Sequence, residues 1–122
     1  TSIRFVGSIY DKHALDSLRY YASIYFHGHS VGGTNPSLLE AMASQAFIIA
    51  HDNEFNGSVC GENAYYFTSK EDVSTLILAN RDGDGRERKK MIQQNLRTVY
   101  QDYSWNHIVE SYENLFMSGM QF

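Results

Sequence analysis

Short apolar runs alternate with longer stretches of helical periodicity along most of the chain. Four of these runs predict β-strands, at 2–8, 23–28, 46–51 and 64–68. The run AFIIAH at 46–51 is almost continuously apolar, which is typical of a strand buried on both faces in a parallel sheet.

Five stretches with apolar residues at helical spacing predict helices at 12–22, 35–45, 70–80, 86–103 and 104–116. We expect N-caps at Asp11 or a neighbour, at Asn35 and at Ser104, with Pro36 in the first helical position of its helix. Polar segments that contain glycine predict loops at 52–63 and 81–85.

The alternation of strands and helices predicts an α/β fold. We expect a Rossmann-like open parallel sheet of three to four strands with flanking helices, and a single domain over 1–122. The first strand arrives at the very start of the sequence, so we expect the chain to be the later part of a larger domain.

Composition and charge narrow the functional classes. The chain is 43% hydrophobic and 20% charged, which fits a folded globular domain. Its net charge of -4 argues against nucleic acid as a partner. No apolar run is long enough for a membrane span, and the first residues lack the pattern of a signal peptide. The single cysteine, Cys60, excludes an internal disulfide, and we expect a cytoplasmic location.

The stretch HGHSVGGTNPSLLEAMA at 27–43 joins a predicted strand to a predicted helix. Ligands of open α/β sheets bind at the carboxyl ends of the strands, and a helix N-terminus there is an anion site. The candidate phosphate-binding residues lie in the turn and the first helical residues: Gly32, Gly33, Thr34, Asn35 and Ser37. Glu40 lies about 6 Å further along the helix axis and could accept hydrogen bonds from a ribose. The alternative is a plain solvated helix face formed by Ser37, Glu40 and Ser44.

The histidines at the start of this stretch have two interpretations. His27 and His29 alternate along a strand, and with His51 and Asp52 they could form a zinc site. The other interpretation is a buried, hydrogen-bonded His27 and a His29 that contacts a ligand or orients the phosphate loop. No fixed metal-ligand spacing is present, so we expect no metal.

GGTNPSLLEAMA, followed by FIIAHDNEFNGSVCGENAYYF and by YSW, resembles a known pattern. It is similar to the C-terminal half of retaining nucleotide-sugar glycosyltransferases of the GT-B fold, in the group 1 or family 4-like class. The form HGHSVGGTNPSLLEAM looks closest to a bacterial subgroup similar to rhamnosyltransferases of surface polysaccharide synthesis.

The resemblance implies roles for individual residues. Glu40 matches the second glutamate of the family's E-x7-E motif, which holds the nucleotide ribose. Residues 34–37 match the turn whose amides meet the donor phosphates. Gly32 stands where the family has its first glutamate, so Ser30 or His29 would take its place near the donor sugar, with His29 as the candidate catalytic residue.

The resemblance also implies a reaction and partners. A nucleoside diphosphate sugar would donate its glycosyl group to a hydroxyl of a saccharide or lipid-linked acceptor in bacterial polysaccharide synthesis, without a metal or other cofactor. The family's basic pair for the diphosphate and its N-terminal acceptor domain are absent from this sequence. We therefore expect a fragment that binds nucleotide weakly and transfers nothing alone.

Further expectations concern assembly, and three other functions stay open. We expect the full-length enzyme to associate peripherally with membranes, and the fragment to self-associate through an uncovered sheet edge. The alternatives are a non-catalytic nucleotide- or phosphate-binding module, a sugar-nucleotide epimerase of the same fold, and a zinc hydrolase built on the histidines.

Overall fold

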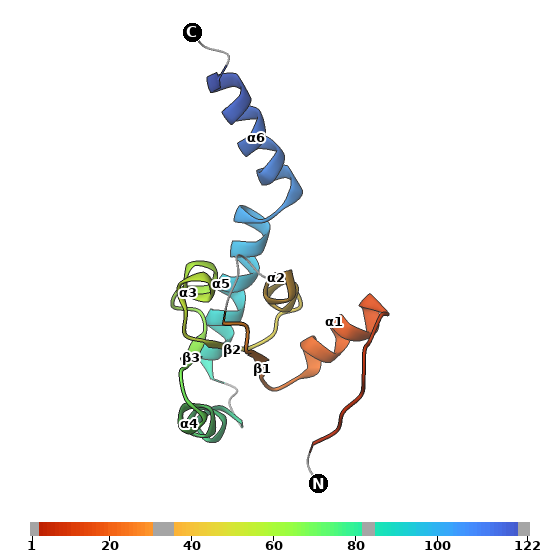
Figure 1. Cartoon of the computed structure of the whole chain (residues 1–122), viewed down its shortest axis with the longest axis vertical. Helices are drawn as coiled ribbons and strands as arrows, with labels where there is room; N and C mark the ends of the chain where they lie inside the picture. Colours follow the sequence, from red (N-terminus) through yellow and green to blue (C-terminus); the bar gives the residue numbers. More distant parts are fainter. Residues whose placement is uncertain (1–2, 31–35, 82–84, 120–122) are drawn as a thin grey trace.

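The computed structural model describes residues 3–30, 36–81 and 85–119 of the chain. In order, its elements are α1 (Lys12–Tyr21), β1 (Tyr25–His27), α2 (Pro36–Ala43), β2 (Ile48–His51), α3 (Glu54–Cys60), β3 (Tyr65–Phe67), α4 (Lys70–Asn80), α5 (Arg86–Asp102) and α6 (Trp105–Gly119). Figure 1 shows the sheet near the middle of the molecule, α1 to one side of it, and α6 continuing beyond α5 and away from the sheet.

The sheet is parallel, with the strand order β1-β2-β3. Phe26 pairs with Ile49, and Ile49 pairs in turn with Tyr65. Each crossover contains a helix, as parallel neighbours require. The prediction of an α/β fold with an open parallel sheet and flanking helices is confirmed, with three strands.

Side chains alternate across the central strand and build two clusters. Ile48 and Ala50 point to the face covered by α2 and α3, where they pack with Leu38, Met42, Val59, Cys60 and Ala64. Phe47 and Ile49 point to the other face, where they pack with Met91, and Leu76 of α4 contacts this cluster. β2 is buried on both faces up to Ala50, which accounts for its almost continuously apolar sequence.

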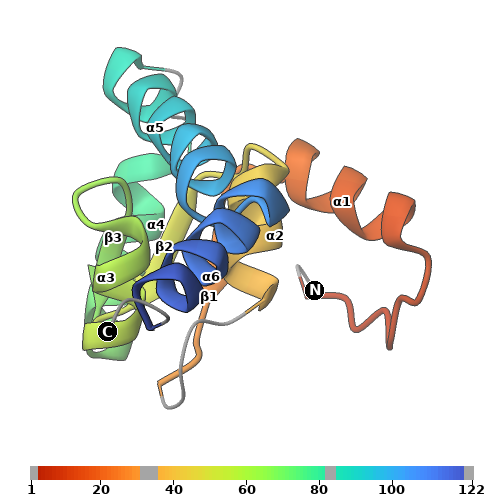
Figure 2. The ribbon, with the colours of Figure 1, turned by 90° about the horizontal axis from the view of Figure 1, so that it is seen from above.

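The strand predicted at 2–8 is wrong for its described residues. Residues 3–10 form neither helix nor strand, and Phe5 is 96% exposed. The alternating apolar residues suit a strand, but a strand forms only where a neighbouring strand satisfies its backbone groups. Figure 1 shows this segment joined to the end of α1 that is farther from the sheet and running past α1 without pairing with a strand, and Figure 2 shows it from above.

The loop predicted at 52–63 is also wrong, because it contains α3. The side chain of Asn53 caps this helix by accepting a hydrogen bond from the backbone N–H of Asn56 at 2.9 Å. Gly57 lies inside the helix, and glycine and asparagine are weak helix formers, which is why the pattern predicted a loop. Packing of Val59 and Cys60 against the core compensates for this weak propensity.

Two predicted N-caps are confirmed. Asp11 accepts a hydrogen bond from the N–H of His13 at 3.0 Å, and Ser104 accepts one from the N–H of His107 at 3.2 Å. Pro36 is the first residue of α2, as predicted, whereas the cap predicted at Asn35 lies outside the described residues.

α2 ends in a Schellman motif. Gln45 has φ of 60°, and its N–H donates to the carbonyl of Met42 at 3.1 Å, while the N–H of Ala46 donates to the carbonyl of Ala41 at 3.1 Å. This turn reverses the chain and delivers it into β2.

The outermost helices keep apolar side chains exposed. They include Leu18 and Tyr21 on α1 and Tyr112, Leu115 and Phe116 on α6. No helix in the described part of the chain combines the length and apolar character of a membrane span.

Candidate functional site

The carboxyl ends of β1 and β2 are joined by a cluster of side-chain amides. Asn53 donates from Nδ2 to the carbonyl of His29 at 2.9 Å, and Asn56 donates to the same carbonyl at 3.2 Å. Asn56 also donates to the carbonyl of His51 at 2.9 Å. These bonds hold the segment after β1 against the start of α3. We call His29, His51, Asn53 and Asn56 the edge cluster.

Asn56 is the buried member of the edge cluster. Asn56 is 4% exposed, and its amide bridges two backbone carbonyls from different strand ends. Hydrogen bonds in such a place are shielded from water, so losing one leaves an unsatisfied buried group. The carbonyl of His29, just after β1, is thus held by two side-chain amides.

A column of stacked rings runs along β1 towards this edge. Tyr25, His27 and His29 share one face of the strand, with ring centroids 6.2 Å and then 5.7 Å apart. His27 is 3% exposed, and its Nε2 is buried without a hydrogen-bond partner in the described residues. Burial, and to a smaller extent the charge of His29, lowers the pKa of His27. His27 is thus a neutral packing residue, while His29 is exposed at the carboxyl end of β1.

Glu40 lies on the face of α2 that meets α1. Its Oε2 accepts a hydrogen bond from Nη1 of Arg19 at 2.8 Å, and the same Nη1 bonds Oδ1 of Asp16 at 3.2 Å. Arg19 is buried, with its Cζ 5.9 Å from the centre of the Tyr25 ring. Ser44, on the same helical face as Glu40, donates to Asp16 at 3.4 Å. Glu40, the residue predicted to bind the ribose, therefore lies near the ring column and is hydrogen-bonded to an arginine of α1.

The predicted site residues are placed only in part. Ser37 and Glu40 are on α2, and His29 follows β1. The other candidates of the phosphate turn lie outside the described residues: Gly32, Gly33, Thr34 and Asn35.

Sequence reasoning missed Arg19, Asn53 and Asn56. Arg19 follows the apolar Leu18 in the predicted helix 12–22, where apolar residues are expected to face the core. The signal for Asn53 was present, since an asparagine just before an acidic residue is typical of an N-cap. Nothing in the sequence identified Asn56, whose bonds join positions 27 residues apart.

The zinc alternative finds no support in the geometry. Among the residues that the structure describes, no group of three or more His, Cys, Asp or Glu side chains could hold a metal ion. His27 is buried in the ring column, and the Asn53 amide contacts Nδ1 of His51 at 3.3 Å.

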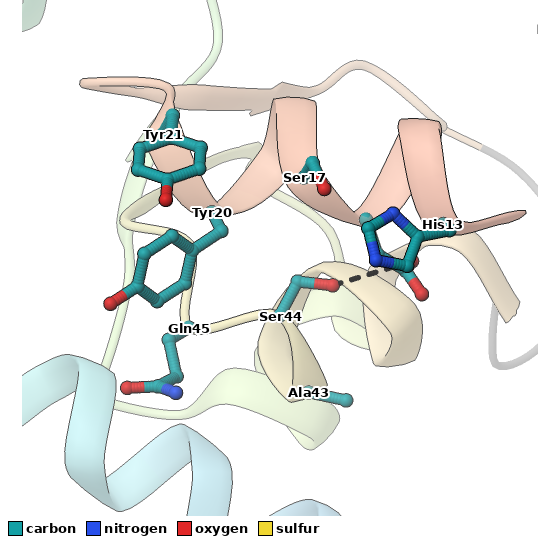
Figure 3. Close-up of a pocket in the computed structure, with 8 residues that line it drawn as sticks. His13, Ser17, Tyr20, Tyr21, Ala43, Ser44 and Gln45 are labelled. Carbon is teal, nitrogen blue, oxygen red and sulfur yellow. Dashed lines mark hydrogen bonds between the residues drawn. The ribbon is translucent and has the colours of Figure 1, made fainter.

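A pocket of about 360 Å³ lies between α1 and the end of α2, at the opposite end of α2 from the edge cluster. Figure 3 shows Tyr20, Tyr21 and Gln45 at one end of it and His13 at the other, with the dashed hydrogen bond from Ser44 to Asp16 between them. Ligands of open parallel sheets bind at the carboxyl ends of the strands, so the edge cluster is the stronger candidate site.

Comparisons with protein-family models, with curated proteins and with solved structures return no match to this chain.

Proposed function

We propose that this chain is the nucleotide-binding portion of a retaining glycosyltransferase of the GT-B fold. One observation carries the proposal: β1 ends at His27 on the carboxyl edge of a parallel sheet, and the next element, which begins at Pro36, is a helix that bears Glu40. This arrangement matches the general location of nucleotide sites in open α/β sheets. The edge cluster supports it, because a ligand site needs a rigid starting point for its loop.

In this proposal the donor is a nucleoside diphosphate sugar. Its diphosphate lies at the N-terminus of α2, where backbone N–H groups after Pro36 and the positive end of the helix dipole favour an anion. Gly32, Gly33, Thr34, Asn35 and Ser37 contribute donors or allow close approach. As the anomeric bond breaks, negative charge builds on the diphosphate, and the same fixed donors stabilise it.

Glu40 and His29 have separate roles in the proposed site. Glu40 accepts hydrogen bonds from the hydroxyls of the nucleotide sugar, and 43% of its side chain is exposed for this purpose. His29, exposed at the mouth of the edge, contacts the donor sugar as the candidate catalytic residue. The chemistry needs no metal, since the charge is stabilised by backbone donors.

The proposed acceptor is a saccharide or a lipid-linked saccharide of bacterial polysaccharide synthesis, bound by a part of the enzyme that this sequence does not contain. A cytoplasmic enzyme associated with the membrane surface would meet such an acceptor. The chain alone would then bind donor nucleotide and transfer nothing.

The proposal is tested by nucleotide binding. A thermal-shift screen of UDP, GDP, dTDP and their sugar conjugates identifies the ligand, and calorimetry then compares Glu40→Ala with the unchanged chain. We expect a loss of about 1–3 kcal/mol in binding free energy, the scale of hydrogen bonds to a charged group.

Glu71→Ala removes a carboxylate from α4, on the opposite face of the sheet, and is the matched control. It should leave the affinity unchanged. Equal affinities of the Glu40→Ala variant and the unchanged chain would contradict the role of Glu40.

A further inference from the structure

Arg19 is a buried charge on a helix at the margin of the fold. Its side chain is 7% exposed, whereas the preceding Leu18 is 54% exposed. A helix that turns leucine outward and arginine inward opposes the usual burial preference, because a buried guanidinium is unfavourable unless it is paired. The contacts of Arg19 have to account for its position.

The guanidinium of Arg19 contacts three elements, and one of its nitrogens bonds two carboxylates. Nη1 donates to Glu40 on α2 at 2.8 Å and to Asp16 on α1 at 3.2 Å. The guanidinium also lies over the ring of Tyr25 on β1, with Cζ 5.9 Å from the ring centroid. Because the guanidinium is planar and held by these contacts, its bond restrains Oε2 of Glu40, while Nε of Arg19 is buried without a hydrogen-bond partner among the described residues.

Glu40 keeps room for a ligand after this pairing. A carboxylate has roughly four acceptor positions, and the bond from Arg19 occupies one of them. Asp16 differs, since it accepts hydrogen bonds from Lys12, Arg19 and Ser44. The hydrogen bond from Lys12, with a smaller contribution from Arg19, holds the pKa of Asp16 below its ordinary value. Of the two carboxylates, Glu40 is the one that is both fixed and available.

We infer, on the premise of the proposed function, that Arg19 is a positioning residue that aims Glu40 at the sugar hydroxyls of the bound nucleotide. A carboxylate fixed in advance loses little conformational freedom when those hydroxyls donate to it, so the hydrogen bonds yield more affinity. Arg19 thereby sets the preference for nucleotides that carry these hydroxyls over nucleotides that lack them, without itself touching the ligand.

The test measures selectivity for the sugar hydroxyls. Calorimetry gives the affinity of the full chain for UDP, GDP and dTDP, each beside its 2′,3′-dideoxy form, and the ratio of the two affinities is the readout. We expect a ratio of about tenfold in the unchanged chain, from one to two hydrogen bonds to a charged acceptor. The ratio should fall close to one in Glu40→Gln and to about threefold or less in Arg19→Met.

Three further variants separate positioning from folding. Arg19→Lys keeps the charge but loses the planar group, and it should recover part of the ratio. Asp16→Asn leaves the bond from Arg19 to Glu40 in place and should preserve the ratio. Arg88→Met is the matched control: Arg88 lies over the ring of Phe47 at 4.3 Å but bonds to backbone carbonyls, so its loss should not alter the ratio.

The outcomes distinguish the inference from the function on which it rests. A ratio retained in Arg19→Met but lost in Glu40→Gln overturns the inference and leaves the proposed function standing. A ratio close to one in the unchanged chain, or no binding of any of the six nucleotides, overturns both. If circular dichroism shows that Arg19→Met does not fold, Arg19→Lys decides, and an unchanged ratio in that variant overturns the inference.

Discussion

The two faces of the sheet bury different kinds of side chain. On the face covered by α2 and α3, the apolar cluster is bordered by buried polar groups from three elements: Arg19, His27 and Asn56. On the opposite face, Phe47, Ile49 and Met91 form an apolar cluster, and Arg88 lies at its rim. Buried polar groups are unfavourable unless they are hydrogen-bonded, so the polar side chains at the first cluster need specific partners, as does Asn95 of α5, which donates to the carbonyl of Asn63.

Two arginines make this contrast specific. Both lie over an aromatic ring, Arg19 over Tyr25 and Arg88 over Phe47. Arg88 donates to the backbone carbonyls of Asn80 and Ser23, so it fastens the ends of neighbouring elements. Arg19 pairs with the carboxylate side chains of Asp16 and Glu40, and Glu40 remains 43% exposed. The same residue type thus bonds to backbone carbonyls on one face and to carboxylate side chains on the other.

The largest effect is expected from Asn56→Ala. This change removes the buried amide that donates to the carbonyls of His29 and His51. The carbonyl of His29 keeps its bond from Asn53, whereas the carbonyl of His51 loses this donor. We expect a loss of about 2–3 kcal/mol in the free energy of unfolding, measured by urea denaturation. Asn53→Ala, at a more exposed cap of the same helix, should lose about 1 kcal/mol. Equal losses would show that burial does not distinguish the two amides.

A smaller effect is expected from Arg19→Met. Breaking a fully buried ion pair is strongly destabilising, but Asp16 and Glu40 are partly exposed and water can solvate them after the change. We therefore expect Arg19→Met to lower the free energy of unfolding by about 2 kcal/mol, and Arg88→Met to lower it by about 1 kcal/mol. Urea denaturation measures both losses. A larger loss for Arg88→Met would reverse the comparison between the two arginines.

The smallest effect concerns pH. Burial lowers the pKa of His27 in the folded chain, so the unfolded chain takes up a proton more readily below about pH 6.5. Stability should be at its full value above that pH and should decline as pH falls below it. His27→Phe keeps an aromatic ring in the column and should show a shallower decline in melting temperature between pH 7 and 5. His13→Phe, at an exposed position, is the control, and it should decline as steeply as the unchanged chain.

Local patterns predicted much of this fold. The continuous apolar run around Ile49, Pro36 at a helix start and the caps Asp11 and Ser104 are each readable from a few neighbouring residues. The segment around Phe5 shows the limit of such patterns, because alternation indicates a strand only when a partner strand is available.

The candidate site was less predictable than the fold. Glu40 and His29 were identified from their position in a strand-loop-helix pattern. The partner of Glu40 was not, because whether Leu18 or Arg19 faces inward depends on how α1 rotates against α2. The contact of Asn56 with His29 likewise depends on the register of β1 against β2, which no short stretch of sequence specifies.

Gln45 holds a left-handed backbone at the reversal between α2 and β2, a conformation in which glycine is normally favoured. For a residue with a Cβ this conformation is unfavourable by about 1 kcal/mol. The chain therefore folds below the stability that a glycine at this bend would give it. The glutamine places an amide on the wall of the pocket beside Tyr20. A glycine at this bend would relieve the backbone strain but would remove that amide from the pocket.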